Sequence, residues 1–427
     1  MGSAILPVLV CLALPAIAQN EAASPRDKMR DIRDLARQGS GVIARLQAYL
    51  TDPVVEVRVE AVKAIVALGT QRSLEPLVQA TRDNDAEIQL RATDGLVNFY
   101  LPGYVDTGFS ATLRRAGKAI RGRWTDTNDQ VIDPFIQVRP EVIDALGKLA
   151  RGGMDMTVRA NAARAVGVLR GRAAIPDLIE ALRSKDDRVL YESLVALQKI
   201  RDPGAAEKIA FLLRDFNEKV QIAAIETTGL LQNKEALPRL REALGRARSA
   251  AVRRAALTAI AMLPDPSSRD LYSQYFNDKD DAMRAAAAEG FARLKNPADL
   301  PAIEKAFSQE RKTNARLSQA FAMVSLGKKE LSEFSALQYL INTLNSRSWR
   351  GVAQPFLVEL TRDAEVRQAV YRAVPGGTRD EKMLLAQVLA RSGDRDTVPV
   401  LEQLSRDTDL EVAQAGLRAL RTLRARL

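Results

Sequence analysis

The sequence predicts an all-α protein in which about 11 helical hairpins stack into a right-handed α-α superhelix. A segment of the form apolar-Arg-x-x-Ala-x-x-Ala-x-x-x-Leu-Gly, clearest at residues 57–69, recurs with a period of mostly 31 or 32 residues. Apolar residues within these segments are spaced three and four apart, which is typical of a helix with one buried face. Hydrophobic residues make up 46% of the chain but aromatic residues only 5%, which favours helices packed at close range.

The N-terminal residues 1–18 are predicted to be a signal peptide. The apolar run at residues 5–18 is shorter than the roughly 20 residues of a membrane span, and Ala16-Ile17-Ala18 has the small residues of a cleavage site. We therefore expect export, to the periplasm or by secretion, after cleavage near Ala18. Retention as an N-terminal anchor and a buried first helix are the alternatives. Residues 19–26 are a predicted linker, which includes Ser24 and Pro25 as the signals for the first helix.

Residues 27–427 are predicted to form a single superhelical domain of repeated units, each consisting of a helix, a tight turn and a second helix. No hairpin buries its apolar face alone, so stacked hairpins share a continuous core. Prolines that open the first helix are Pro76, Pro176, Pro238, Pro301 and Pro399. Aspartates expected to cap the second helix are Asp52, Asp83, Asp215, Asp278 and Asp407. An insertion at about residues 100–139 and a degenerate unit at about residues 331–375 interrupt the period.

The period, the proline-opened first helix and the Val-Arg-x-x-Ala second helix resemble HEAT repeats of the phycobilisome-lyase HEAT-like type. The resemblance covers about residues 41–427. It implies a helical solenoid and leaves the activity open, since such units serve scaffolds, adaptors and a few enzymes.

The composition excludes several kinds of active site. The chain has no histidine, so imidazole metal sites and Ser-His or Cys-His pairs are absent. Its single cysteine, Cys11, lies within the predicted signal peptide. We therefore expect no catalytic residue, metal or cofactor. The di-iron site of deoxyhypusine hydroxylase, an enzyme of this repeat type, uses His-Glu pairs and does not carry over to this chain.

Arginine and aspartate side chains recur in phase with the repeat. We interpret them as a structural ladder that pins neighbouring units, with Asp52 contacting Arg58, and Asp278 contacting Arg284, across the turn between two helices. A row of arginines for anionic ligands is the alternative interpretation. The predicted ladder consists of Asp52, Arg58, Arg159, Arg253, Asp278, Arg284 and Arg316.

The segment 99–139 is the predicted binding surface. It contains six of the 21 aromatic residues and a basic stretch without acidic residues, and long insertions in repeat arrays often carry the binding face. The candidate binding residues are Tyr100, Tyr104, Arg114, Arg115, Lys118, Arg121 and Trp124. A helix docked on the solenoid with a solvated basic rim is the alternative.

The sequence thus predicts a non-catalytic scaffold or adaptor of the cell envelope, which binds another protein through its concave face and the 99–139 insertion. The net charge of +10 keeps a second hypothesis open, a binder of an anionic membrane surface or polymer. An enzyme of the repeat-lyase or hydroxylase type is a further alternative. Nucleic acid is not an expected partner, because no recognition motif accompanies the positive charge.

Overall fold

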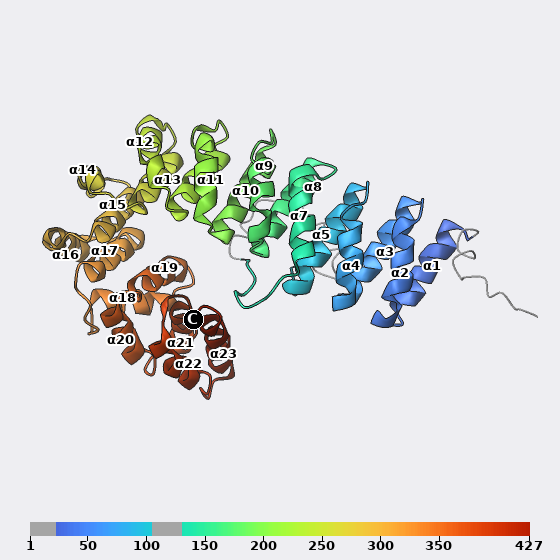
Figure 1. The fold of residues 1–427 in the computed structure, drawn as a ribbon. Helices are drawn as coiled ribbons and strands as arrows, with labels where there is room; N and C mark the ends of the chain where they lie inside the picture. The colour runs from blue at the N-terminus through green and yellow to red at the C-terminus, as the bar shows by residue number, and fades with distance from the viewer. Residues whose placement is uncertain (1–22, 105–129) are drawn as a thin grey trace, which may run out of the picture.

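A computed structural model describes residues 23–104 and 130–427 of the chain. In these two ranges the regular elements are α-helices and 3-10 helices, without strands, which confirms the predicted all-α solenoid. The helices form a curved double row, and the C-terminal helices curl back toward the middle of the array (Figure 1). The signal peptide predicted at residues 1–18 lies outside the described residues.

The helices of the inner row pack each on the next along the superhelix. They are α1 (Pro25–Ala36), α3 (Val55–Leu68), α5 (Ala86–Tyr100), α8 (Met156–Val168), α10 (Asp187–Ile200), α11 (Glu218–Leu230), α13 (Ala250–Ala261), α15 (Asp281–Leu294), α17 (Thr313–Ser325), α19 (Arg350–Leu360), α21 (Arg379–Ser392) and α23 (Leu410–Arg424).

The outer row carries the helix that precedes each inner helix after α1, which makes 11 hairpins in the described ranges. Its members are α2 (Ile43–Ala48), α4 (Leu74–Ala80), α7 (Pro140–Gly152), α9 (Ile175–Ala181), the 3-10 helix η5 (Pro203–Arg214), α12 (Leu237–Arg246), α14 (Arg269–Tyr275), α16 (Leu300–Gln309), α18 (Ala336–Asn342), α20 (Ala364–Ala373) and α22 (Val398–Leu404). Short 3-10 turns lie beside several of them, at Ser40–Val42, Tyr49–Thr51, Gln71–Ser73, Arg172–Ala174, Lys234–Ala236, Pro266–Ser268, Pro297–Asp299, Thr343–Asn345 and Arg395–Thr397.

The repeated aspartate does not cap the inner helix itself. Asp83 accepts the backbone N–H of Asp85 at 2.9 Å, and Asp85 is the residue whose carboxylate accepts the first N–H groups of α5. The expected cap is therefore wrong by two residues, because the first carboxylate closes the turn and the second caps the helix. The same division recurs in the pairs Asp215 and Asn217, Asp278 and Asp280, and Asp407 and Asp409.

Small residues bring the inner helices close together. A Cβ atom added to Gly167 in α8 would lie 2.7 Å from the Cα atom of Ala196 in α10. One added to Gly229 in α11 would lie 3.0 Å from the Cα atom of Ala259 in α13. The abundant alanine of the sequence thus serves close packing, and one hydrophobic core runs from Ile32 to Leu423.

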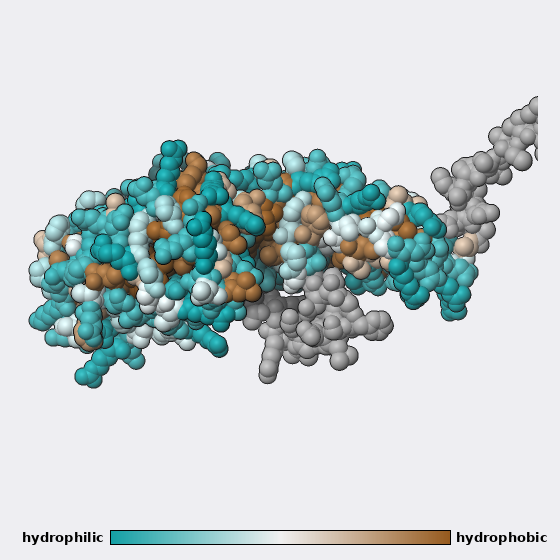
Figure 2. All heavy atoms as spheres, turned by 90° about the horizontal axis from the view of Figure 1, so that it is seen from below, coloured by the Kyte–Doolittle hydropathy of each residue, from teal (hydrophilic) through white to brown (hydrophobic). Residues whose placement is uncertain are grey.

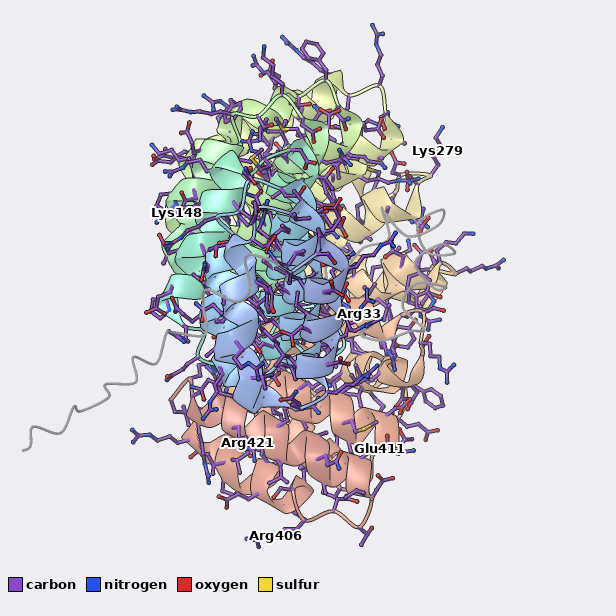
Figure 3. All side chains as sticks on the ribbon, turned by 90° about the vertical axis from the view of Figure 1, so that its right-hand side faces the viewer. Arg33, Lys148, Lys279, Arg406, Glu411 and Arg421 are labelled. Carbon is purple, nitrogen blue, oxygen red and sulfur yellow. The ribbon has the colours of Figure 1, made fainter. Side chains whose placement is uncertain are left out.

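Charged side chains project from the ends and outer edges of this array, as Lys148, Lys279 and Arg406 do in Figure 3. Hydrophobic residues lie in patches among hydrophilic ones on the face seen in Figure 2. None of the helices in the described ranges is long and apolar enough to span a membrane.

Candidate functional site

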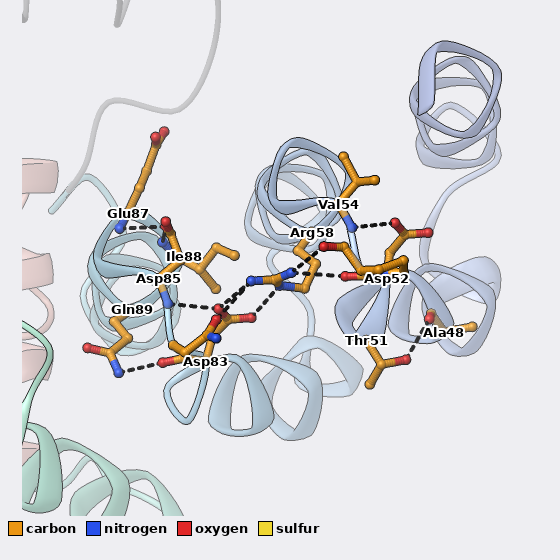
Figure 4. Close-up of polar contacts among 12 residues, drawn as sticks. Ala48, Thr51, Asp52, Val54, Arg58, Asp83, Asp85, Glu87, Ile88 and Gln89 are labelled. Carbon is orange, nitrogen blue, oxygen red and sulfur yellow. Dashed lines mark hydrogen bonds and ion pairs between the residues drawn. The ribbon is translucent and has the colours of Figure 1, made fainter. Parts of the chain in front are cut away.

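Within the predicted ladder, Arg58 joins its own unit to the next. Arg58 donates from Nε and Nη2 to the two carboxylate oxygens of Asp83, at 2.8 and 3.0 Å (Figure 4). Its Nη1 donates to the backbone carbonyl of Asp52 at 2.9 Å. The Asp52 carboxylate instead accepts from Lys28 of α1 at 2.8 Å. The expected side-chain contact between Asp52 and Arg58 is therefore replaced by a contact with the Asp52 carbonyl, because the Arg58 side chain reaches forward to Asp83 in the next turn.

The same geometry returns at other steps of the superhelix. Arg284 pairs with Glu310 at 2.8 Å while its Nη1 donates to the carbonyl of Asp278 at 2.7 Å. Lys382 pairs with Asp407 at 2.9 Å. The hydrogen bond from Arg284 lowers the pKa of Glu310, which is mostly buried.

The other predicted ladder arginines use different contacts. Arg159 donates to the carbonyl of Ala150 at 3.2 Å. Arg253 is exposed, and its neighbour Arg254 pairs with Asp280 of the next unit at 2.7 Å. Arg316 lies over the rings of two aromatic residues, 4.8 Å from the centroid of Phe307 and 5.2 Å from that of Tyr339. The contacts of the predicted ladder arginines thus differ from unit to unit.

Two of the predicted binding residues are placed by the structure. Tyr100 is buried, and its hydroxyl accepts the backbone N–H of Arg139 at 3.1 Å, so this side chain joins the two ends of the insertion. Tyr104 is half-buried beside Arg164, and burial raises the pKa of its hydroxyl. Arg114, Arg115, Lys118, Arg121 and Trp124 lie outside the described residues, and their role remains a prediction.

The concave side of the superhelix holds a cavity of about 1640 Å³. Its walls come from the C-terminal ends of the inner helices in the middle of the array and from α19, α21 and α23, which curl back to face them (Figure 1). Partly exposed apolar side chains of Leu230, Met262 and Val358 lie among its polar and charged ones. The cavity therefore offers both apolar and charged contacts.

Four arginines gather in this cavity from distant parts of the chain. Arg170 follows α8 and Arg201 follows α10, whereas Arg362 follows α19 and Arg391 lies near the end of α21. Loss of surrounding water and the positive charges of Arg391 and Arg201 lower the pKa of Arg170. Loss of water and the charges of Arg391 and Arg362 likewise lower the pKa of Arg201. We call Arg170, Arg201, Arg362 and Arg391 the arginine cluster.

Among the residues that the structure describes, the arginine cluster lacks acidic partners of the kind that neutralise other cations of the cavity. Arg293 is paired with Glu359 at 2.9 Å, and Lys329 with Asp363 at 2.7 Å. The side chains of the cluster form no ion pair within the described part of the chain, although the charge of Asp133 acts on Arg170. Four arginines thus line one cavity without an ion-pair partner in the described ranges, which favours an anionic ligand.

The sequence carries a signal for half of this cluster. Arg170 and Arg201 occupy the repeat position of Gly69, 12 residues after the apolar residue that begins the motif. All three have left-handed backbone conformations, with φ of 50°, 56° and 55°. The signal is therefore a long, positively charged side chain at the repeat position that glycine occupies at residue 69. Arg362 and Arg391 follow no comparable rule, and only the folding back of the C-terminal units brings them near.

The model for HEAT repeats matches residues 14–97, 143–215, 208–271 and 243–323, which together make up more than half of the chain. The chain therefore belongs to the HEAT-repeat family. A search of curated proteins gave no match. Within the described ranges, no group of three or more metal-ligating side chains is placed to hold an ion.

Three solved structures align with parts of the chain. The complex of CpcE and CpcF of phycocyanin lyase from Nostoc aligns with 18% identity over 61% of this chain and 90% of the other, at a TM-score of 0.37. Human deoxyhypusine hydroxylase in complex with glycerol aligns with 16% identity over 67% and 96%, at a TM-score of 0.28. An engineered protein aligns with 19% identity over 90% and 98%, at a TM-score of 0.30.

Proposed function

We propose that the protein is a non-catalytic scaffold of the cell envelope that binds another protein in the cavity on its concave side. The observation that carries this proposal is the cavity itself. It is larger than the roughly 300–1,000 Å³ of most small-molecule sites, and its lining mixes apolar and charged side chains as protein interfaces do. HEAT repeats, which form extended concave surfaces, also support protein binding.

A crosslinking experiment tests the binding face. A photo-reactive amino acid is placed at Gln387, which lines the cavity, and in a matched variant at Glu207, which is exposed on the outer row. We expect a discrete crosslinked partner from Gln387 and none from Glu207 when cells are irradiated. Equal crosslinking from both positions, or from neither, would contradict binding in the cavity.

The location in the envelope is tested separately, by mass spectrometry of the N-terminus of the protein purified from cells. Cleavage after Ala18, as the predicted signal requires, gives a chain that begins at Gln19. A cytoplasmic protein that still begins at Met1 would remove the envelope from the proposal and leave the scaffold untouched.

A further inference from the structure

We infer that the arginine cluster binds the carboxylate groups of an acidic, extended segment of the partner protein. The inference rests on the proposed function and adds the chemistry of the partner. It is supported by the charge of the cluster, by the backbone of two of its members, and by the side chains between them.

The positive charge of the four arginines favours a ligand with several acidic groups. The guanidinium groups come from two opposing walls, Arg170 and Arg201 on one and Arg362 and Arg391 on the other. Loss of surrounding water, followed by the positive charges of other members of the cluster, lowers the pKa values of Arg170 and Arg201, so the positive charges repel one another. Arginine stays protonated at neutral pH, so the repulsion persists until a ligand supplies negative charge between the walls. Carboxylates suit this task because they accept two parallel hydrogen bonds from one guanidinium group.

The backbone shows that two of these arginines are held at a cost to folding. A left-handed conformation is easier for glycine than for a residue with a Cβ atom, and Gly69 and Gly327 occupy this repeat position elsewhere in the superhelix. Arg170 and Arg201 keep the conformation without making an ion pair that would compensate for it. Gln232 and Lys295 hold the same conformation at this repeat position, with φ of 59° and 52°, and they also line the cavity, so this position brings polar side chains to the cavity from four units.

The lining of the cavity distinguishes an acidic protein segment from other anions. The partly exposed Leu230, Met262 and Val358 would stay uncovered beneath a free phosphate, whereas a peptide with acidic and apolar side chains covers them and reaches the arginines. A flat lipid surface does not reach the walls of a cavity enclosed by the curve of the molecule. The size of the cavity, about 1640 Å³, also suits a stretch of polypeptide.

Fluorescence anisotropy with the full chain tests the inference. The probe is a short fluorescein-labelled peptide of mixed glutamate and leucine, and the control probe has glutamine in place of each glutamate. We expect binding of the acidic probe only, weakening steeply with salt. The test variant combines Arg170→Gly with Arg201→Gly, and the matched variant combines Arg248→Gln with Arg311→Gln, which removes the same charge from exposed turns outside the cavity.

The double glycine variant should bind the acidic probe about tenfold more weakly or worse, while its thermal unfolding midpoint stays equal or rises, because glycine suits the left-handed backbone. The matched variant should bind like the unaltered protein. Equal weakening in both variants, or unchanged binding in the glycine variant, would overturn the inference.

Two competitors separate the remaining anions. Displacement of the probe by equimolar inorganic phosphate would show a small-anion site, and Arg170-dependent sedimentation with phosphatidylserine vesicles would show a membrane site; either result overturns the inference. If the crosslink from Gln387 persists in the double glycine variant, the proposed scaffold function stands and the assigned partner chemistry fails.

Discussion

Arginines at the second position of the repeat motif have three different surroundings in this protein. Arg58 forms a buried ion pair with Asp83, Arg316 lies over two aromatic rings, and Arg253 is exposed to solvent. All three side chains start from the same repeat position, and the residues that their own hairpin and the next unit place nearby decide the contact. The energetic value of the position therefore varies along the superhelix.

Arg58→Ala should lower the free energy of unfolding by about 2–4 kcal/mol, because it leaves the carboxylate of Asp83 buried without its charged partner. Arg253→Ala changes the same repeat position where the side chain is exposed, and should stay within about 0.5 kcal/mol of the unaltered protein. Urea denaturation followed by circular dichroism measures both. Similar losses in the two variants would contradict the role of the ion pair.

The pair of Arg284 and Glu310 should make stability depend on acidity. The hydrogen bond from Arg284 lowers the pKa of Glu310 below its usual 4.5. Stability from this pair is therefore fully present above pH 4.5 and is lost as the pH falls through the lowered pKa of the folded state. Glu310→Gln should reduce the slope of the unfolding free energy against pH in that acidic range. Urea midpoints at a series of pH values check this, and an unchanged slope would contradict it.

At the scale of the helix, spacing depends on single small residues. α8 and α10 approach so closely at Gly167 that an added methyl group would meet the backbone of Ala196. Backbone atoms do not move aside as a flexible side chain does, so the helices themselves must shift.

Gly167→Ala should therefore destabilise the protein by about 1–3 kcal/mol, against the usual helix preference for alanine. Gly245→Ala is the matched change in α12, where nothing lies within 4 Å of the added atom, and should be neutral or stabilising by up to about 1 kcal/mol. Thermal unfolding of both variants tests the difference. A Gly167→Ala variant as stable as Gly245→Ala would show that the inner helices pack less closely than described.

At the scale of the whole molecule, one contact bypasses a unit. Arg293 in α15 pairs with Glu359 in α19 at 2.9 Å, across the intervening helix α17. Arg293 also pairs with Glu289 at 3.1 Å on its own helix. In a solenoid whose units contact only their neighbours, such a pair requires tight curvature. It lies where the array turns back and closes the cavity.

Glu359→Ala should open the superhelix, because it removes this link while leaving Arg293 paired with Glu289. We expect a larger radius of gyration in small-angle X-ray scattering, with helix content unchanged by circular dichroism. Glu60→Ala removes an ion pair between the adjacent helices α1 and α3, at 2.6 Å from Arg33, and should leave the radius unchanged. Equal radii for both variants would show that the link does not set the curvature.

The repeat period, the helical hairpins and their order along the chain could be predicted from the sequence, and family and structure confirm them. These features are local: apolar spacing within one helix and a proline at its start are complete within about 30 residues. The candidate cavity could not be predicted, although Arg170 and Arg201 stand at a position where the motif favours glycine.

The tertiary structure alone decided the partners of the ladder and the gathering of the arginine cluster. The Asp52 carboxylate pairs with Lys28, whereas Arg58 contacts the Asp52 carbonyl. The spacing of residues in the sequence does not determine toward which neighbouring unit a side chain points. Arg201 and Arg391 act on each other across the curve of the superhelix. Their proximity results from small rotations that accumulate from unit to unit, and the interfaces between units determine those rotations.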